Sequence, residues 1–201
     1  MMRIGVLASG RGSNLQALID AWKQGDIIGE IVAVGSDHEQ AYALQRAKNA
    51  EIPNQAFPLE RYSSRVEQEQ ALLSWLQENG VKLLVLAGFM RVLSKEFLHE
   101  LNIPVVNIHP SLLPAFAGLH AQRQAVDYGV KLTGCTVHFV DEGLDSGPII
   151  MQEAVPVLPE DTEETLADRI LEVEHRLYPL TVRLIASGKV KRIGRIVKVS
   201  E

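Results

Sequence analysis

Apolar runs alternate with helical patterns along the first half of the chain. Short, nearly continuous apolar runs predict buried strands, because a strand covered on both faces carries few polar residues. The predicted strands are residues 3–8, 30–36, 82–88 and 105–109. Between them, apolar residues at helical spacing predict helices at 14–25, 40–50 and 64–78, with a short one after Ser94. This order predicts a mainly parallel sheet with helices on both faces.

The pattern changes near residue 134. Apolar and polar residues alternate in GCTVHFV (134–140), and PIIMQEAVPV (148–157) follows after a short acidic loop, which predicts antiparallel strands. Residues 162–187 predict a long helix that is interrupted at Pro179, and a short basic tail ends the chain. We therefore expect one α/β domain over residues 1–201. It would be Rossmann-like, with a mostly parallel twisted sheet flanked by helices and antiparallel strands in the C-terminal part.

Composition and charge narrow the class of protein. The chain has 201 residues, a formal net charge of −5 and one cysteine, Cys135. Interspersed acids and bases argue against a nucleic-acid surface, and no apolar stretch has the length of a membrane span. A single cysteine forms no intrachain disulfide, which is compatible with a reducing compartment. We expect a cytoplasmic protein that binds neither nucleic acid nor membrane.

A glycine-containing loop, ASGRGSN (8–14), lies between the first predicted strand and helix. Glycines let backbone amides approach a ligand closely, and the positive end of a helix attracts an anion. Leu15 stands where a dinucleotide fingerprint has its third glycine, and no Gly-Lys-Ser/Thr follows. The loop predicts a site for one phosphate. A plain turn in which Ser13 or Asn14 caps the helix is the alternative.

Two polar residues close the strand 105–109. Asn107 and His109 are separated by one residue, so they point the same way at a carboxyl edge where open parallel sheets bind ligands. In the loop DEGLDSGP (141–148), Asp145 would favour the imidazolium form of His109 if it lies beside it. Two donors and a carboxylate suit an oxyanionic, tetrahedral transition state. No serine or cysteine is evidently coupled to the histidine, so the nucleophile would belong to a substrate.

Plainer interpretations of the same residues remain. A histidine at a strand end is often a structural residue, and an aspartate before Ser-Gly-Pro is often a turn former. Zinc ligation by His109, His120, His138 and Asp145 is another alternative. The sequence shows no closely spaced ligand pair to support it, so we expect no metal.

Five segments, taken in order, resemble the phosphoribosylglycinamide formyltransferases, folate-dependent enzymes of purine synthesis. They are SGRGSNL, LAGFMRVLS, NIHPSLLPAFAGLHA, VHFVDEGLDSGPII and EHRLYP, spread between about residues 3 and 188. The Asn-x-His-Pro-Ser-Leu-Leu-Pro part is shared with other folate formyl-group enzymes. Ala117 departs from the proline that many relatives carry before Gly118.

The resemblance implies a formyltransferase domain over 1–201, as a monomer or homodimer without a metal. Its substrates would be glycinamide ribonucleotide and 10-formyltetrahydrofolate. Asn107 and protonated His109 would stabilise the oxyanion, and Asp145 would keep His109 charged. Gly12, Ser13 and Asn14 would bind the phosphate, and Glu174 the ribose side. The residues implied to hold the folate are Arg65, Met90, Arg91, Val92, Leu93, Asn107, Val140, Asp141, Glu142, Gly143, Leu144 and Asp145.

Two other functions stay open. A formyltetrahydrofolate hydrolase would use water in place of the amine, although such relatives usually carry an additional regulatory domain. A nucleotide-binding module, without catalysis or as an oxidoreductase, would use the segment GRGSN. The missing third glycine argues against a dinucleotide.

Overall fold

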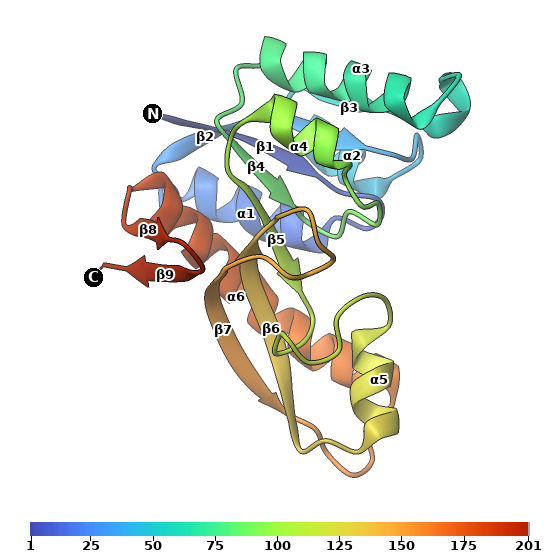
Figure 1. The fold of residues 1–201 in the computed structure, drawn as a ribbon, viewed down its shortest axis with the longest axis vertical. Coiled ribbons are helices and arrows are strands. Elements are labelled where there is room, and N and C mark those ends of the chain that lie inside the picture. The colour runs from blue at the N-terminus through green and yellow to red at the C-terminus, as the bar shows by residue number, and fades with distance from the viewer. Residues whose placement is uncertain (201) are drawn as a thin grey trace. The chain divides into compact units, whose positions relative to one another are not determined.

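The structure is a computed structural model that describes residues 1–200, and the chain divides into two compact units, Met1–Val106 and Asn107–Glu201. The first unit alternates strands and helices as the hydrophobic pattern predicts (Figure 1). Its elements are β1 (Met2–Leu7), α1 (Ser13–Lys23), β2 (Gly29–Ser36), α2 (Tyr42–Asn49), β3 (Asn54–Ala56), the 3-10 turn η1 (Leu59–Arg61), α3 (Arg65–Glu78), β4 (Leu83–Leu86), α4 (Lys95–Leu101) and the start of β5 (Val105–His109).

The sheet of the first unit grows outward from β1 in both directions. β1 pairs in parallel with β2 and with β4, and β2 pairs in parallel with β3. Because crossovers between parallel strands are right-handed, this order places α1 and α2 on one face of the sheet and α3 and α4 on the other. The packing agrees, since α1 contacts α2 and α3 contacts α4.

Polar residues begin two of these helices where the sequence predicts. The Ser64 side chain accepts a hydrogen bond from the Glu67 backbone N–H, and Ser94 does the same for Phe97. Ser64 and Glu67 have the spacing of a capping box, but only half of it forms, because the Glu67 carboxylate accepts from the N–H of Ser63 instead of Ser64. β3 was not predicted, since three residues are too few to show an alternating pattern.

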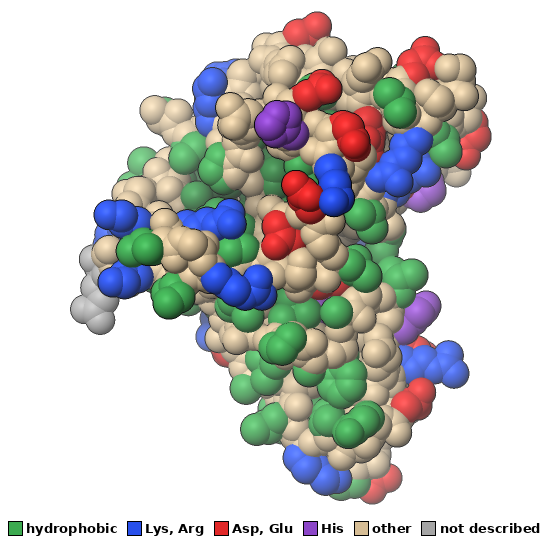
Figure 2. All heavy atoms as spheres, in the orientation of Figure 1, with side chains coloured by type: hydrophobic (Ala, Val, Ile, Leu, Met, Phe, Trp, Pro, Cys, Tyr) green, Lys and Arg blue, Asp and Glu red, His purple; other side chains and the backbone are tan. Residues whose placement is uncertain are grey.

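The second unit contains the end of β5, α5 (Ala121–Tyr128), β6 (Leu132–Phe139), β7 (Ile149–Pro156), α6 (Glu163–Ala186), β8 (Val190–Ile193) and β9 (Ile196–Val199). As predicted, β6 and β7 are antiparallel, and α6 packs on both of them. The basic tail forms the hairpin β8–β9, which the sequence analysis did not predict. Its lysines and arginines project into solvent (Figure 2).

The predicted interruption at Pro179 is wrong, because α6 runs through it without a break. A proline removes one backbone N–H, and with it one bond of the helical ladder. On either side, Leu177, Tyr178 and Val182 are buried, so packing of the apolar face holds the turn.

In the first unit the strand order is β3-β2-β1-β4, and in the second unit β6 pairs with β7. Parallel pairing in the first unit and the antiparallel pair β6–β7 confirm the predicted fold class, a mostly parallel α/β sheet with antiparallel strands in the C-terminal part. One domain over residues 1–201 stays a prediction. Within residues 1–200, no helix has the length and apolar character that a membrane crossing requires.

Candidate active site

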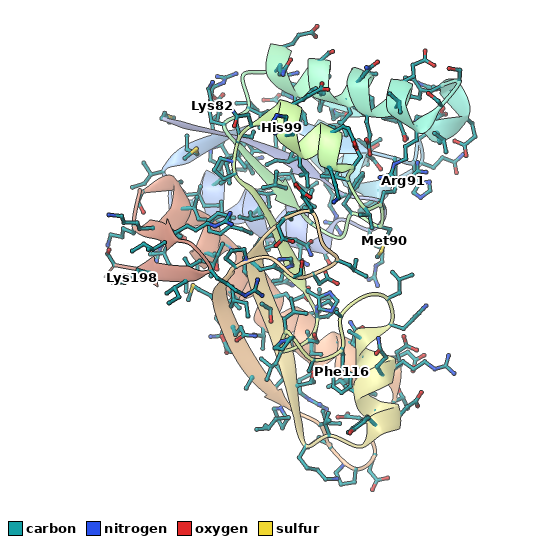
Figure 3. All side chains as sticks on the ribbon, viewed as in Figure 1. Lys82, Met90, Arg91, His99, Phe116 and Lys198 are labelled. Carbon is teal, nitrogen blue, oxygen red and sulfur yellow. The ribbon has the colours of Figure 1, made fainter. Side chains whose placement is uncertain are left out.

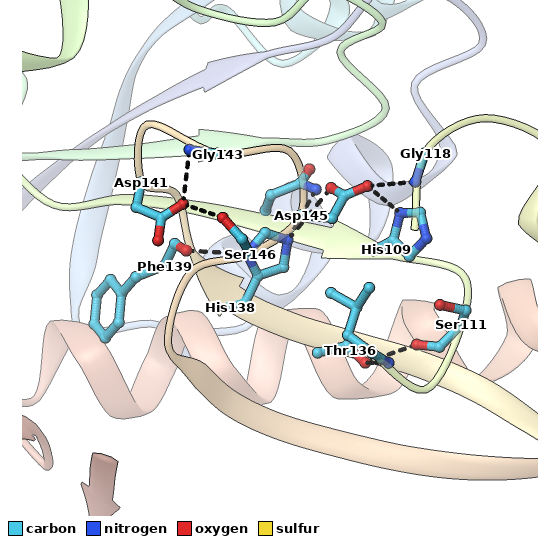
Figure 4. Close-up of polar contacts among 12 residues, drawn as sticks. His109, Ser111, Gly118, Thr136, His138, Phe139, Asp141, Gly143, Asp145 and Ser146 are labelled. Atoms are coloured by element: carbon cyan, nitrogen blue, oxygen red, sulfur yellow. Dashed lines mark hydrogen bonds and ion pairs between the residues drawn. The ribbon is translucent and has the colours of Figure 1, made fainter. Parts of the chain in front are cut away.

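His109, the last residue of β5, is buried between two hydrogen-bond acceptors. Its Nδ1 lies 3.3 Å from Oδ2 of Asp145, a contact drawn in Figure 4. Its Nε2 lies 2.8 Å from the carbonyl oxygen of Phe116. Neither acceptor carries a hydrogen, so only a ring with hydrogens on both nitrogens satisfies both contacts. The geometry around His109 therefore favours the imidazolium.

Asp145 is held in place by its loop between β6 and β7. The Gly118 N–H donates to Oδ2 of Asp145 at 2.9 Å. Oδ1 of Asp141 braces the loop by accepting from Gly143 N–H and from the Ser146 hydroxyl (Figure 4). Gly147 is required for closure, because a Cβ there would lie 1.7 Å from the Phe139 carbonyl oxygen. The carboxylate is thus positioned before any ligand binds.

Asn107 joins the same polar cluster through His138. The Asn107 Nδ2 lies 3.3 Å from Nε2 of His138, and that Nε2 lies 3.8 Å from Oδ1 of Asp145. The expected convergence of Asn107, His109 and Asp145 is therefore confirmed as geometry, while their chemical roles stay predictions. From the sequence, His138 enters only as an alternative zinc ligand. The sequence feature that points to His138 is the alternation of side chains along β6, which places His138 on the same face of the strand as Thr136.

A hydrogen-bonded network holds the chain that follows His109. The Thr136 hydroxyl donates to the Ser111 carbonyl at 2.6 Å and accepts from the Leu113 N–H at 3.0 Å (Figure 4). The Gln152 amide donates to Thr136 and to the Leu113 carbonyl. Ser111 donates its own hydroxyl to the Ala115 carbonyl, 2.5 Å away. The hydroxyl nearest to His109 in sequence is thus engaged with the backbone, which fits a nucleophile that comes from a substrate.

The glycine loop of the first unit leaves the beginning of α1 uncapped. Gly12 precedes the helix with φ 67°, and no side chain caps the first turn. A Cβ at Gly12 would lie 2.8 Å from Ala43, so the close approach of α2 requires glycine. Arg46 braces the loop by donating to the Arg11 carbonyl at 2.8 Å. Because the N-cap residue is a glycine without a side chain, the backbone can approach a ligand closely at the positive end of the helix, which suits an anion.

Four of the predicted folate residues line one hollow in the first unit, with an empty volume of about 370 Å³ that includes its open mouth. They are Arg65, Arg91, Val92 and Leu93. The Arg65 guanidinium donates to Glu69 and to the Val92 carbonyl, and Arg91 donates to Gln68. The Met90 side chain is 70% exposed on the same segment, where Figure 3 labels it beside Arg91. The structure thus brings Arg65 together with residues 91–93 around one cavity, while Met90 is not among the residues that line it.

The remaining predicted residues belong to the second unit. Glu174 is buried on α6, and Val140 to Asp145 form the loop after β6. Two backbone groups, the Phe116 carbonyl and the Gly118 N–H, were missed because side-chain patterns carry no information about them. Within residues 1–200, no three His, Cys, Asp or Glu side chains are arranged to hold a metal ion.

An amide, an imidazole and a carboxylate that converge at the end of β5 suit a class of enzymes that stabilise an oxyanion while a substrate supplies the nucleophile. The comparisons with known proteins narrow this class. A family model described as formyl transferase matches residues 2–182, and the chain therefore belongs to the formyl transferase family. The predicted family resemblance is confirmed.

Relatives of about the same length as this chain, and solved structures, agree with this assignment. The chain is 42% identical to the phosphoribosylglycinamide formyltransferase of Haemophilus influenzae, over 95% of this chain and 90% of that protein. The crystal structure of glycinamide ribonucleotide transformylase 1 from Symbiobacterium toebii matches with a TM-score of 0.97 and 50% identity, over 100% of this chain and 95% of that one.

Larger relatives contain a segment similar to this chain. The human trifunctional purine biosynthetic protein adenosine-3 is 45% identical over 99% of this chain, which covers 20% of that protein. The chain spans 14% to 20% of the length of such trifunctional relatives.

Proposed function

We propose that this chain transfers the formyl group of 10-formyltetrahydrofolate to the amine of glycinamide ribonucleotide, giving formylglycinamide ribonucleotide and tetrahydrofolate in purine biosynthesis. The observation that carries the proposal is the placement of His109 between the Asp145 carboxylate and the Phe116 carbonyl. A charged N–H donor beside an amide donor suits the oxygen that becomes negative when an amine attacks a formyl group.

The reaction begins when the amine nitrogen bonds to the formyl carbon and an electron pair moves to the formyl oxygen. Asn107 and His109 stabilise this oxyanion by hydrogen bonds. In the structure, the Nε2–H of His109 donates to the Phe116 carbonyl. To stabilise the oxyanion, this N–H must break that hydrogen bond and donate to the formyl oxygen instead. As the intermediate collapses, the bond from the formyl carbon to the folate N10 breaks. The amine nitrogen gives up a proton, N10 receives one, and Asp145 with His109 handles the transfer.

The substrates would occupy separate sets of residues in the two units. Backbone and side-chain donors of Gly12, Ser13 and Asn14 would hold the phosphate, and the Glu174 carboxylate would accept from the ribose hydroxyls. The hollow beside Arg65 and residues 90–93 would take the folate, whose glutamate carboxylates match guanidinium groups. Asn107 and the loop 140–145 would complete the folate site.

We also infer the setting of the reaction. No metal is proposed, since the formyl group arrives activated on the folate. Both proposed substrates are small polar molecules, so a cytoplasmic enzyme that needs neither a nucleic acid nor a membrane as partner is expected. A single domain, present as a monomer or homodimer, is expected, and light scattering after size exclusion measures its mass.

The proposal is tested by incubating the purified chain with 10-formyltetrahydrofolate, with and without glycinamide ribonucleotide. Absorbance follows the loss of formyl-folate, and mass spectrometry follows the formylated ribonucleotide. Turnover that depends on the amine supports the transferase. Turnover without it indicates a hydrolase, and ligand binding without turnover indicates a nucleotide-binding module. A His109→Asn variant should lose activity, whereas the matched His99→Asn variant, on the exposed side of α4, should retain it.

A further inference from the structure

His138 is a buried histidine whose hydrogen positions can be read from its neighbours. It lies near the end of β6 with 2% of its surface exposed. Its Nδ1 is 2.9 Å from the carbonyl oxygen of Phe139, and Figure 4 marks this contact with a dashed line. A carbonyl oxygen only accepts, so Nδ1 carries the hydrogen of this contact.

The other ring nitrogen faces the Asn107 amide. Nε2 of His138 lies 3.3 Å from Nδ2 of Asn107, and an amide NH₂ group only donates. Nε2 is therefore the acceptor, and the ring is neutral. The reversed amide would place Oδ1 against Nε2 and would require a second hydrogen on the ring, that is, an imidazolium.

The charges around His138 decide between these two arrangements. Burial lowers the pKa of His138, and the contact with the Phe139 carbonyl, together with Asp145 and Asp141, acts in the opposite direction. His109 contributes to lowering this pKa, because two cations on either side of one carboxylate repel each other. The net direction is downward, so the neutral ring and the amide orientation with Nδ2 toward His138 agree with each other.

We propose that His138 is a positioning residue for formyl transfer, acting as a neutral imidazole that accepts a hydrogen bond from Asn107 and directs the second amide N–H of Asn107 at the formyl oxygen. This proposal rests on the proposed function. It also explains why the Asp145 carboxylate has to balance the positive charge of only one histidine, His109. With a lone pair on Nε2, His138 makes no hydrogen bond to Asp145, whose Oδ2 is ion-paired with His109 and accepts from the Gly118 N–H.

Replacing His138 by glutamine or by asparagine separates the contact of its Nε2 from the contact of its Nδ1. His138→Gln places an amide near Nε2, where its oxygen accepts from Asn107. The shorter side chain of His138→Asn reaches only the Nδ1 position, so its NH₂ keeps the bond to the Phe139 carbonyl and nothing accepts from Asn107. A purely structural role would make the two variants similar. His99→Gln, on the exposed surface of α4, is the control for replacing a histidine by an amide.

The expected result is a change in kcat with little change in KM. His138→Asn should lower kcat roughly 10- to 10²-fold, somewhat less than the usual loss of an oxyanion donor, because Asn107 remains but is no longer oriented. The KM values for both substrates should stay within about threefold, since the change does not affect contacts that bind the ground state and the transition state equally. His138→Gln should recover most of the rate. In an Asn107→Ala background, His138→Asn should cost little more.

Nitrogen-15 NMR of the histidine-labelled wild-type protein provides a readout that does not need turnover. We expect the neutral ring of His138 with its hydrogen on Nδ1 at pH 7. An imidazolium or an Nε2–H tautomer overturns the proposal, as does equal loss of rate in the Gln and Asn variants. The proposal is also overturned if His138→Asn lowers kcat by the same factor in the Asn107→Ala background as it does in the wild type. Wild-type protein that forms no formylated ribonucleotide refutes the proposed function, and the role in formyl transfer with it, while the NMR result still decides the tautomer.

Discussion

Replacing Asp145 by asparagine tests the charge that the proposed mechanism needs most. The substitution keeps the shape of the side chain and an oxygen for the Gly118 N–H, and removes the negative charge beside His109. At 3.3 Å, an imidazolium and a carboxylate attract each other by about 5 kcal/mol at an effective dielectric constant of about 20. Desolvation offsets much of this, and a hydrogen bond to a charged group contributes about 1.5–3 kcal/mol net.

This free energy sets the size of the expected effect. If it is lost from the transition state, kcat should fall by roughly 10- to 150-fold, at 1.36 kcal/mol for each factor of ten. Substrate affinity should change far less, because the charge on His109 matters most when the oxyanion forms.

The assay is steady-state turnover at saturating concentrations of both substrates, with circular dichroism to verify folding. Asp127→Asn removes an exposed carboxylate from α5 and is the matched control, expected to be within twofold of wild type. In combination with His109→Asn, the two losses should be far from multiplicative, because the pair acts as one unit. Near-full turnover of Asp145→Asn, or two losses that multiply, would refute the reasoning that Asp145 acts through His109.

Three further predictions follow from buried groups. Gly12→Ala should weaken binding of glycinamide ribonucleotide and lower the free energy of unfolding by about 1–3 kcal/mol in urea titrations, since a Cβ at φ 67° meets Ala43. Burial raises the pKa of Cys135 to about 12, so a thiol reagent at pH 8 should label the protein only after denaturation, and rapid labelling of native protein would contradict this. Because the pKa of His138 is lower in the folded protein, the unfolded chain takes up this proton at a higher pH than the folded chain does. The free energy of unfolding should therefore keep its full value above about pH 6.5 and fall below that pH by at most about 1.4 kcal/mol per pH unit. His138→Gln should flatten this part of a Tm-versus-pH curve.

The hydrophobic pattern was sufficient for most of the fold, because strands and helices with long buried faces show their periodicity in the sequence. It failed where packing overrides local preference or where the element is short. Pro179 lies inside α6 because its neighbours are buried, and β3 and the hairpin β8–β9 are three or four residues per strand. Such elements form when neighbouring chain segments supply their hydrogen bonds and contacts.

By itself, the sequence determined the class of sheet, the glycine loop before α1 and the residue types of the candidate site, since each is carried by local spacing. Only the tertiary structure decided that Asp145 meets His109 across 36 residues of chain, a contact that depends on how the loop after β6 closes at Gly147. It also placed the Phe116 carbonyl on the second nitrogen of His109 and His138 on the Asn107 amide. These contacts set which nitrogen carries a hydrogen, and no sequence pattern records them because they join backbone and side-chain atoms brought together by folding.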